Sequence, residues 1–247
     1  MVLNGRGYQL IEAIPETRHT PVRGVLFDLD DTLNDRTASW MAFVNFLAGP
    51  LSGYLQPCVT AAVLQTIVAA DRVGYRAKEE LFEELRTQLP WRSPLTVAEI
   101  EGIWRERFPK CVVARDSAIE VLHLLRKRGL RSAIVTNGRT QTQRAKIEQM
   151  GIVELVDAVV ISEAIGVKKP DAKMFQTALQ AIGVTAAEAI FVGDNPELDV
   201  QAPARVGMRT VWLENERIWP ENIAEPDYRI TSFSQFVAVL ARANGQI

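Results

Sequence analysis

The chain has 247 residues, of which 47% are hydrophobic, so it can bury a sizeable core in one domain with an insertion or in two small domains. Its formal net charge of −2 argues against the strongly basic surfaces that bind nucleic-acid polymers or acidic membranes. We therefore expect neither a nucleic-acid polymer nor a membrane as a partner. The sequence also lacks an apolar run long enough to cross a bilayer.

The first segment, residues 1–21, is predicted to be a loose lead-in to the folded chain. It lacks a basic start followed by an apolar block, so it does not have the pattern of a secretory signal. The chain has two cysteines, Cys58 and Cys111, without metal-ligand spacing. No disulfide framework is therefore expected, and the two thiols fit the reducing cytoplasm.

The first predicted strand, residues 22–28, is buried and runs directly into a cluster of acidic residues. Asp28, Asp30 and Asp31 follow its apolar run within a few positions. Such carboxylates repel one another unless a cation lies among them, and Mg²⁺ binds through one or two carboxylates, waters and phosphate oxygens. The alternative is an ordinary acidic turn after a strand, which a single cluster would favour.

Residues 36–110 differ from the rest because they show helical periodicity and no convincing strand. Breaks at glycine and proline separate four helical segments, residues 40–47, 59–70, 79–89 and 96–108. Asp35 is predicted to cap the first of these helices, and Asp31 is predicted to face solvent. We interpret this segment as an all-α insertion between the first strand and the remainder of a sheet.

From about residue 112 onward, helices that end in glycine alternate with short, continuously apolar runs. The pattern predicts a parallel α/β sheet covered on both faces, a Rossmann-like fold. The predicted strands are residues 132–136, 158–161, 189–192, 210–213 and 227–230, with a last helix at 233–240. Capping boxes are predicted where Ser or Thr precedes Glu by three positions, at Thr96, Ser117 and Thr185.

Polar residues also follow the later strands. Thr136 and Asn137 end one strand, Asp194 ends another with Asp199 five residues on, and Lys169 precedes a helix. Because ligands bind beyond the carboxyl ends of parallel strands, we expect these side chains at one edge of the sheet. This recurrence makes the ordinary acidic turn the poorer explanation of the first cluster.

Together these residues resemble the haloacid dehalogenase superfamily, whose four motifs are matched in order. The matching segments are Asp28-Leu-Asp30-Asp-Thr32, Thr136 in Ile-Val-Thr-Asn-Gly, Lys169 in Lys-Lys-Pro-Asp, and Gly193-Asp194 through Asp199. The resemblance covers residues 22 to about 240. It implies a catalytic core of residues 22–35 and 111–247, with residues 36–110 as a helical cap domain inserted after the first motif.

The resemblance also implies roles for the aspartates. Asp28 would attack phosphorus, and Asp30 would act as general acid and base, for which its pKa should lie above ~3.9. Mg²⁺ would be held by the Asp28 side chain, the Asp30 backbone carbonyl and the Asp194 side chain. Asp199 would be an outer orienting group or a water-mediated ligand.

The remaining motif residues would bind the phosphoryl group. The resemblance implies that the Thr136 hydroxyl and the Asn137 backbone N–H hold one oxygen, and that Lys169 neutralises another together with the nucleophile. Lys168 is the alternative lysine, but the family places its lysine directly before proline, as Lys169 is placed here.

We therefore expect a Mg²⁺-dependent phosphomonoester hydrolase acting on a small phosphorylated metabolite such as a nucleotide or sugar phosphate. Asp30 argues against a 2-haloacid dehalogenase, because the family's dehalogenases lack this second aspartate. The alternatives are this dehalogenase, a phosphomutase on the same fold and a non-catalytic binding protein. Six cap residues either line the substrate or belong to the cap's own core and surface: Trp40, Phe43, Tyr54, Arg72, Tyr75 and Arg76. The sequence indicates no oligomeric state.

Overall fold

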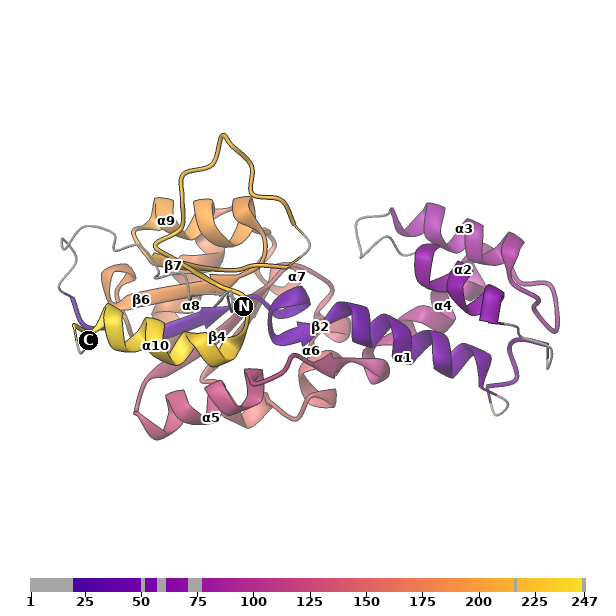
Figure 1. Cartoon of the computed structure of the whole chain (residues 1–247), viewed down its shortest axis with the longest axis horizontal. Coiled ribbons are helices and arrows are strands. Elements are labelled where there is room, and N and C mark those ends of the chain that lie inside the picture. Colours follow the sequence, from indigo (N-terminus) through magenta and orange to yellow (C-terminus); the bar gives the residue numbers. More distant parts are fainter. Residues whose placement is uncertain (1–19, 50–51, 57–60, 71–76, 216, 246–247) are drawn as a thin grey trace, which may run out of the picture.

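A computed structural model of the chain describes residues 20–49, 52–56, 61–70, 77–215 and 217–245. Most of the predicted lead-in and three of the candidate cap residues, Arg72, Tyr75 and Arg76, lie outside these ranges. Figure 1 shows a sheet with helices packed around it and, to one side, a separate group of helices. In the described part of the chain, no helix has the length and apolar character needed to cross a membrane.

Among the described residues, six parallel strands form the main sheet, in the order β5-β4-β1-β6-β7-β8. Their bounds are β1 Gly24–Phe27, β4 Arg131–Thr136, β5 Ala158–Ile161, β6 Ala189–Gly193, β7 Arg209–Leu213 and β8 Tyr228–Ile230. The predicted α/β fold is confirmed, and each of these strands lies within a residue or two of its predicted position. Because β1 is central, its carboxyl end lies between those of β4 and β6.

Helices cover both faces of this sheet, which explains its continuously apolar strands. Val25 and Phe27 of β1 point into one cluster with α5 (Ala118–Lys127), α6 (Thr140–Gln149) and α10 (Phe233–Ala243). Leu26 points into the opposite cluster with α8 (Ala172–Ile182) and α9 (Ala202–Val206). A short helix, α7 (Ser162–Ile165), follows β5. Successive side chains of β1 therefore point to opposite faces of the sheet, and helices cover both faces.

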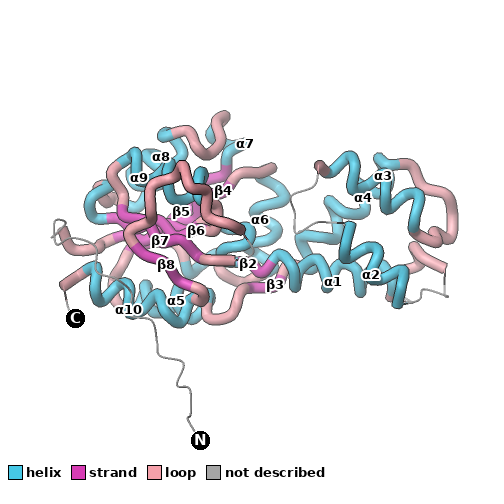
Figure 2. The backbone as a smooth tube through the Cα atoms, turned by 45° about the horizontal axis from the view of Figure 1, so that its top comes forward, coloured by secondary structure: helices cyan, strands magenta, loops and turns pink. Residues whose placement is uncertain are grey.

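The insertion is helical, as predicted, with α1 at Arg36–Ala48, α2 at Ala61–Ala70, α3 at Lys78–Gln88 and α4 at Val97–Arg107. In Figures 1 and 2 these helices lie together, away from the sheet. Trp40 and Phe43 are buried and pack with Phe108, with ring centroids 6.1 Å and 5.9 Å from it. The alternative that these aromatic residues form a core of the insertion is confirmed for Trp40 and Phe43.

Two short antiparallel strands, β2 (Asn34–Asp35) and β3 (Val113–Ala114), join the insertion to the sheet. The Asp35 carboxylate accepts from the Ala38 backbone N–H at 2.8 Å, which confirms its predicted role as the cap of α1. The two connections therefore run side by side.

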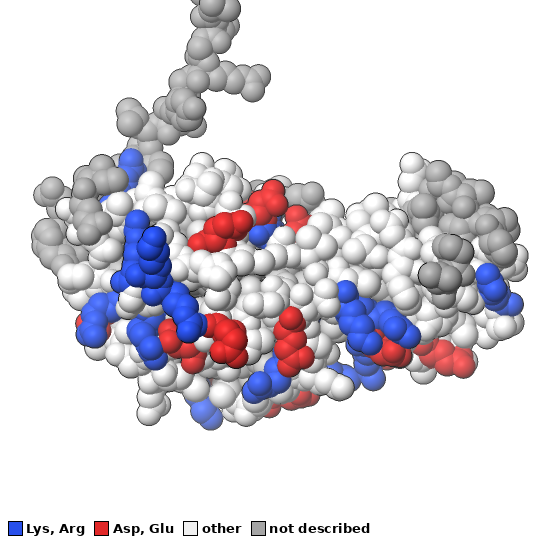
Figure 3. All heavy atoms as spheres, turned by 90° about the horizontal axis from the view of Figure 1, so that it is seen from below, with Lys and Arg blue, Asp and Glu red and all other residues white. Residues whose placement is uncertain are grey.

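Two of the three predicted capping boxes are present. Thr96 and Glu99 form one at the start of α4, and Thr185 forms one on a short 3-10 turn. The prediction at Ser117 is wrong, because its backbone is left-handed (φ 60°) and its side chain makes no capping bond. On the face seen in Figure 3, basic and acidic side chains are interspersed, as the small net charge leads us to expect.

Candidate functional site

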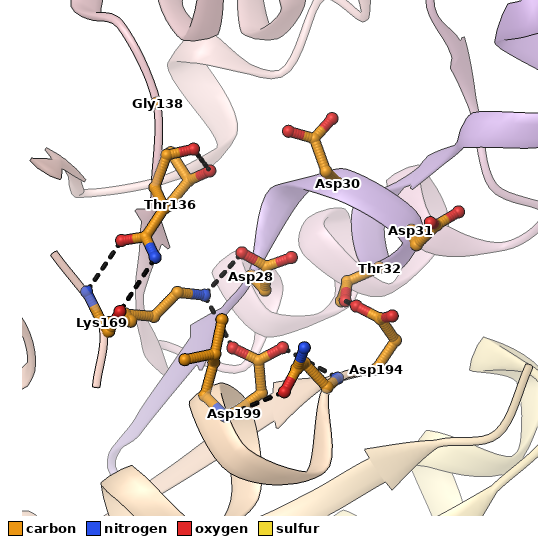
Figure 4. A network of polar contacts seen from close by, with 12 residues as sticks. Asp28, Asp30, Asp31, Thr32, Thr136, Gly138, Lys169, Asp194 and Asp199 are labelled. Atoms are coloured by element: carbon orange, nitrogen blue, oxygen red, sulfur yellow. Dashed lines mark hydrogen bonds and ion pairs between the residues drawn. The ribbon is translucent and has the colours of Figure 1, made fainter. Parts of the chain in front are cut away.

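The carboxyl ends of β1 and β6 bring Asp28, Asp194 and Asp199 together. One carboxylate oxygen from each lies within 4.8 Å of the others, and all three residues are buried. Lys169 reaches into this group, and its Nζ donates to Asp28 Oδ1 at 2.6 Å and to Asp199 Oδ1 at 2.7 Å (Figure 4). The sequence analysis predicted that these four residues meet at one edge of the sheet, and they do.

Burial is the largest influence on the pKa values of Asp28 and Asp199. Burial raises the pKa of Asp28, with Asp199 and Asp194 adding to the rise against the opposing charge of Lys169. Burial likewise raises the pKa of Asp199. Burial opposes the charge of Lys169, but its two carboxylate partners raise its pKa overall, so it stays an ammonium ion. Lys169 and Arg217, which pairs with Asp194, supply two positive charges against three carboxylates, which leaves room for a further cation.

Asp194 has two partners that the sequence analysis missed. Arg217 Nε lies 2.5 Å from Asp194 Oδ2, and Asn215 Nδ2 lies 3.1 Å from the same oxygen. The Asp194 backbone carbonyl accepts from the Trp212 indole at 2.8 Å. These residues lie in or just after β7, the strand beside β6, so the polar residues after the predicted strand 210–213 were a usable signal.

Gly193 is needed for the close approach of β6 to the turn that follows it. A Cβ at this position would lie 2.4 Å from Asp199 Cβ and 2.5 Å from its Cγ, well inside van der Waals contact. Any larger residue would therefore push Asp199 away from Lys169.

Asp30 lies on a different side of the site. Figure 4 shows its carboxylate turned away from Lys169 and the triad. It accepts hydrogen bonds from Lys146 Nζ at 2.7 Å and 2.8 Å, from Gln143 Nε2 at 2.9 Å and from Asn34 Nδ2 at 2.9 Å. The sequence analysis did not single out any of these three donors.

The expected rise in the pKa of Asp30 is wrong for this arrangement. Burial raises it, but the charge and hydrogen bond of Lys146 and the bonds from Asn34 and Gln143 outweigh burial and lower it well below its ordinary value. The expectation assumed that carboxylates are its nearest charged neighbours, whereas α6 supplies a lysine.

Thr136 and Asn137 lie at the carboxyl end of β4. The Thr136 hydroxyl accepts from Gln143 Nε2 at 2.7 Å. The Asn137 side chain clamps the backbone of Lys169, accepting from its N–H at 2.8 Å and donating to its carbonyl at 3.1 Å. Asn137 thus orients Lys169, a contact that the sequence motif did not indicate.

Asp31 is buried, so the prediction that it faces solvent is wrong. Its backbone is left-handed (φ 62°), and its side chain lies within 4.0 Å of Arg115. Burial is the main reason that its pKa is raised to about 7, and repulsion from Asp194 adds to it. The left-handed turn directs the side chain inward, which the sequence pattern does not reveal.

Replacing Asp31 with Asn should make the stability of the metal-free protein less dependent on pH. The raised pKa means that the protonated form stabilises the fold at low pH, and that this contribution is lost as pH rises through about 7. Asn tolerates a left-handed backbone and carries no charge. We expect Asp31→Asn to raise the free energy of unfolding on the order of 1–3 kcal/mol more at pH 8 than at pH 5.

Urea unfolding in the presence of a chelator, at both pH values, measures this difference. The exposed Asp116, which follows β3, supplies the control Asp116→Asn, which should change neither value. An identical gain for Asp31→Asn at pH 5 and pH 8 would contradict the assignment.

Comparison with known proteins gives the same picture as the geometry. The sequence pattern of the haloacid dehalogenase-like hydrolases matches residues 22–207. The glyceraldehyde 3-phosphate phosphatase of Pyrococcus furiosus is 37% identical over 240 residues, covering 91% of this chain and 95% of that one. The phosphoserine phosphatase of Thermus thermophilus is 40% identical over 126 residues, which is 51% of this chain and 49% of that one.

The fold is also similar to solved structures. The magnesium-bound putative HAD-hydrolase YfnB from Bacillus subtilis superposes with a TM-score of 0.67 at 20% identity, over 90% of this chain and 99% of that one. At this identity the likeness concerns the fold. It extends over the insertion as well as the sheet, because it covers nearly the whole chain.

Proposed function

Because the chain belongs to the haloacid dehalogenase-like hydrolase family and is a phosphate monoester hydrolase, we propose that it acts through an aspartyl-phosphate intermediate on Asp28. The observation that carries this proposal is the contact of Asp28 with Lys169 inside a buried acidic triad at the end of the central strand. A carboxylate held there can receive a phosphoryl group, and the resulting acyl phosphate is readily hydrolysed.

The donor set of the triad fits Mg²⁺, which prefers a few carboxylate oxygens together with water and phosphate. Both oxygens of Asp199 are held closely, by Lys169 Nζ at 2.7 Å and the Asn195 backbone N–H at 3.0 Å, whereas Asp194 Oδ1 accepts from the Thr32 hydroxyl at the longer distance of 3.4 Å. We therefore assign the ion to the Asp28 and Asp194 side chains and the Asp30 carbonyl, with Asp199 orienting Lys169. When bound, Mg²⁺ would neutralise charge on the transferring phosphoryl group.

In the first step, an oxygen of Asp28 attacks phosphorus and the bond to the leaving oxygen breaks. Lys169 opposes the rise in the pKa of Asp28 that burial causes, and so favours the ionised nucleophile. Asp30 gives its proton to the leaving oxygen, then takes a proton from the water that attacks the phosphoryl group on Asp28. This attack breaks the bond from phosphorus to Asp28, releases inorganic phosphate and restores the carboxylate. Negative charge on a bound phosphate would raise the pKa of Asp30 and offset Lys146.

The other motif residues bind and orient. We assign a phosphate oxygen to the Thr136 hydroxyl and the Asn137 backbone N–H, because they end the strand beside β1, and another to Lys169, because it contacts Asp28. We assign residues 36–110 to a cap that closes over this edge and excludes water, with residues 22–35 and 111–247 as the core. The neighbouring connections through β2 and β3 support a single hinge region.

The substrate that we propose is a small phosphorylated metabolite. The relatives named above are phosphatases of glyceraldehyde 3-phosphate and phosphoserine, which supports a compact substrate. A nucleotide or a sugar phosphate is also a small phosphorylated metabolite, and we include both in the proposal. Two further statements stay predictions from the sequence: that the protein does not bind a nucleic-acid polymer, and that it is cytoplasmic.

Phosphate release from a panel of monophosphates tests the proposal. The panel contains p-nitrophenyl phosphate, glyceraldehyde 3-phosphate, phosphoserine and nucleoside and hexose monophosphates, each with Mg²⁺ and with a chelator. We expect Mg²⁺-dependent release from at least one small substrate. Metal-independent chloride release from 2-chloropropionate would favour a dehalogenase instead, and phosphoryl transfer within a sugar without free phosphate would favour a mutase. No turnover at all would favour a binding protein.

A further inference from the structure

A second lysine, on α6, holds the carboxylate of Asp30. We propose that Lys146 and Gln143 are positioning residues, which keep the Asp30 carboxylate on the leaving-group side of the site and apart from Lys169 and the acidic triad. This inference rests on the proposed function, because it assigns Asp30 to the leaving group. It concerns two residues outside the segments that carry the motifs.

The contact between Lys146 and Asp30 favours one orientation of the Asp30 carboxylate. Lys146 Nζ lies 2.7 Å and 2.8 Å from the two oxygens of Asp30, so it bridges both. The Lys146 side chain is only 6% exposed, whereas that of Asp30 is 33% exposed. The lysine is therefore enclosed by protein, whereas the carboxylate that it holds is partly exposed.

Gln143 connects this carboxylate to the end of β4. Its Nε2 donates to Asp30 Oδ2 at 2.9 Å and to Thr136 Oγ1 at 2.7 Å. Gln143 and Lys146 are three residues apart on α6, so they share one helix face, and both are buried. One helix thus fixes Asp30 relative to the hydroxyl that we assign to the phosphate.

Phosphoryl transfer requires Asp30 to be separated from Asp28 and Lys169. The attacking and leaving oxygens lie roughly in line on opposite sides of phosphorus, so the nucleophile and the acid must approach from different directions. Lys169 binds Asp28 and Asp199, while Lys146 binds Asp30. Without Lys146, the Asp30 carboxylate would keep the neutral donors Asn34 and Gln143 but lose the cation that bridges its two oxygens.

The test compares two substrates of nearly the same shape, p-nitrophenyl phosphate and phenyl phosphate, with Mg²⁺ present. The nitrophenolate group departs without a proton, whereas phenol, with a pKa of ~10 as in tyrosine, departs much better when protonated. We expect Lys146→Met to lower kcat/KM for phenyl phosphate by about 10²-fold, the scale of general acid catalysis, and to change kcat/KM for p-nitrophenyl phosphate far less. The parameter kcat/KM reports the first phosphoryl transfer, whereas kcat also includes hydrolysis of the intermediate, which both substrates share.

Control variants separate positioning from folding. Arg144→Met, which replaces an exposed basic residue of the same helix, should leave both rates unchanged. The ratio of the two rates does not depend on the fraction of folded protein. If Lys146→Met is insoluble, Gln143→Leu decides the question, with the same direction of change expected. Lys146→Arg, which keeps the charge, should recover part of the ratio.

Two outcomes would overturn the inference in distinguishable ways. An active wild-type enzyme whose rate ratio is unchanged in Lys146→Met and Gln143→Leu would show that these residues are structural, and would leave the proposed function standing. A wild-type enzyme that releases phosphate from neither compound, nor from any other member of the panel above, would overturn the proposed function and this inference with it.

Discussion

Replacing Asp28 with Asn should abolish turnover of every phosphate ester that the wild-type enzyme hydrolyses. An amide cannot form the acyl phosphate, so we expect kcat to fall by at least about 10⁴-fold, the scale for losing a covalent nucleophile. The fold should survive, because the pKa of Asp28 is raised by burial and a neutral group is easier to bury there. Thermal unfolding in the presence of a chelator should therefore show a variant at least as stable as the wild type.

Two measurements check this result. Phosphate release gives the rate, with Asp116→Asn as an exposed aspartate that should keep full activity. Mass spectrometry after rapid acid quenching should find the mass of one phosphoryl group on the wild-type chain, in the peptide that contains Asp28, and none on the variant. Substantial residual turnover by Asp28→Asn would mean that another residue accepts phosphate.

The strands and the residues at their ends could be predicted because short-range chemistry determines them. A continuously apolar run such as the one before Asp28 is typical of a strand in a parallel sheet whose two faces are both covered by helices. In a parallel sheet such strands all end at the same edge, so Asp28, Asp194 and Thr136 could be predicted to lie along it. The strand order, with β1 between β4 and β6, then brings the ends of these three strands side by side.

The partners of these residues could not be predicted in the same way. Lys146 and Gln143 read as ordinary polar positions of α6, and only the packing of that helix against the end of β1 turns them toward Asp30. Arg217 lies in a loop that joins Trp212 to Trp219, whose tilted rings pack with centroids 4.8 Å apart. Sequence spacing identifies which residues can carry charge, whereas tertiary packing decides which charges meet.

Asp31 illustrates the same limit within one motif. The left-handed backbone at this position turns its side chain inward, to within 4.0 Å of Arg115, although the neighbouring positions suggested an exposed turn. Left-handed conformations of residues other than glycine are uncommon, so a sequence pattern gives no reason to expect one here.

Replacing Lys169 with Met should affect both stability and activity, because this lysine pairs with two buried carboxylates. Its Nζ contacts Asp28 and Asp199, and its side chain is 2% exposed. In metal-free protein, breaking such a buried pair is expected to lower the free energy of unfolding by about 3–5 kcal/mol. With Mg²⁺, kcat should fall by a factor that corresponds to about 2.7–4 kcal/mol, the cost of losing one oxyanion donor.

A double-mutant cycle separates these two effects. Asp199→Asn removes one of the carboxylates that Lys169→Met leaves unpaired, so the double variant should recover part of the stability but none of the activity. Urea unfolding and phosphate release measure the two quantities on the same samples. Lys168→Met is the matched control, since Lys168 is exposed and directly precedes Lys169. If Lys168→Met lost activity while Lys169→Met kept it, the phosphate-binding lysine would be Lys168, and the ion pairs of Lys169 would serve only to hold β1 and β6 together.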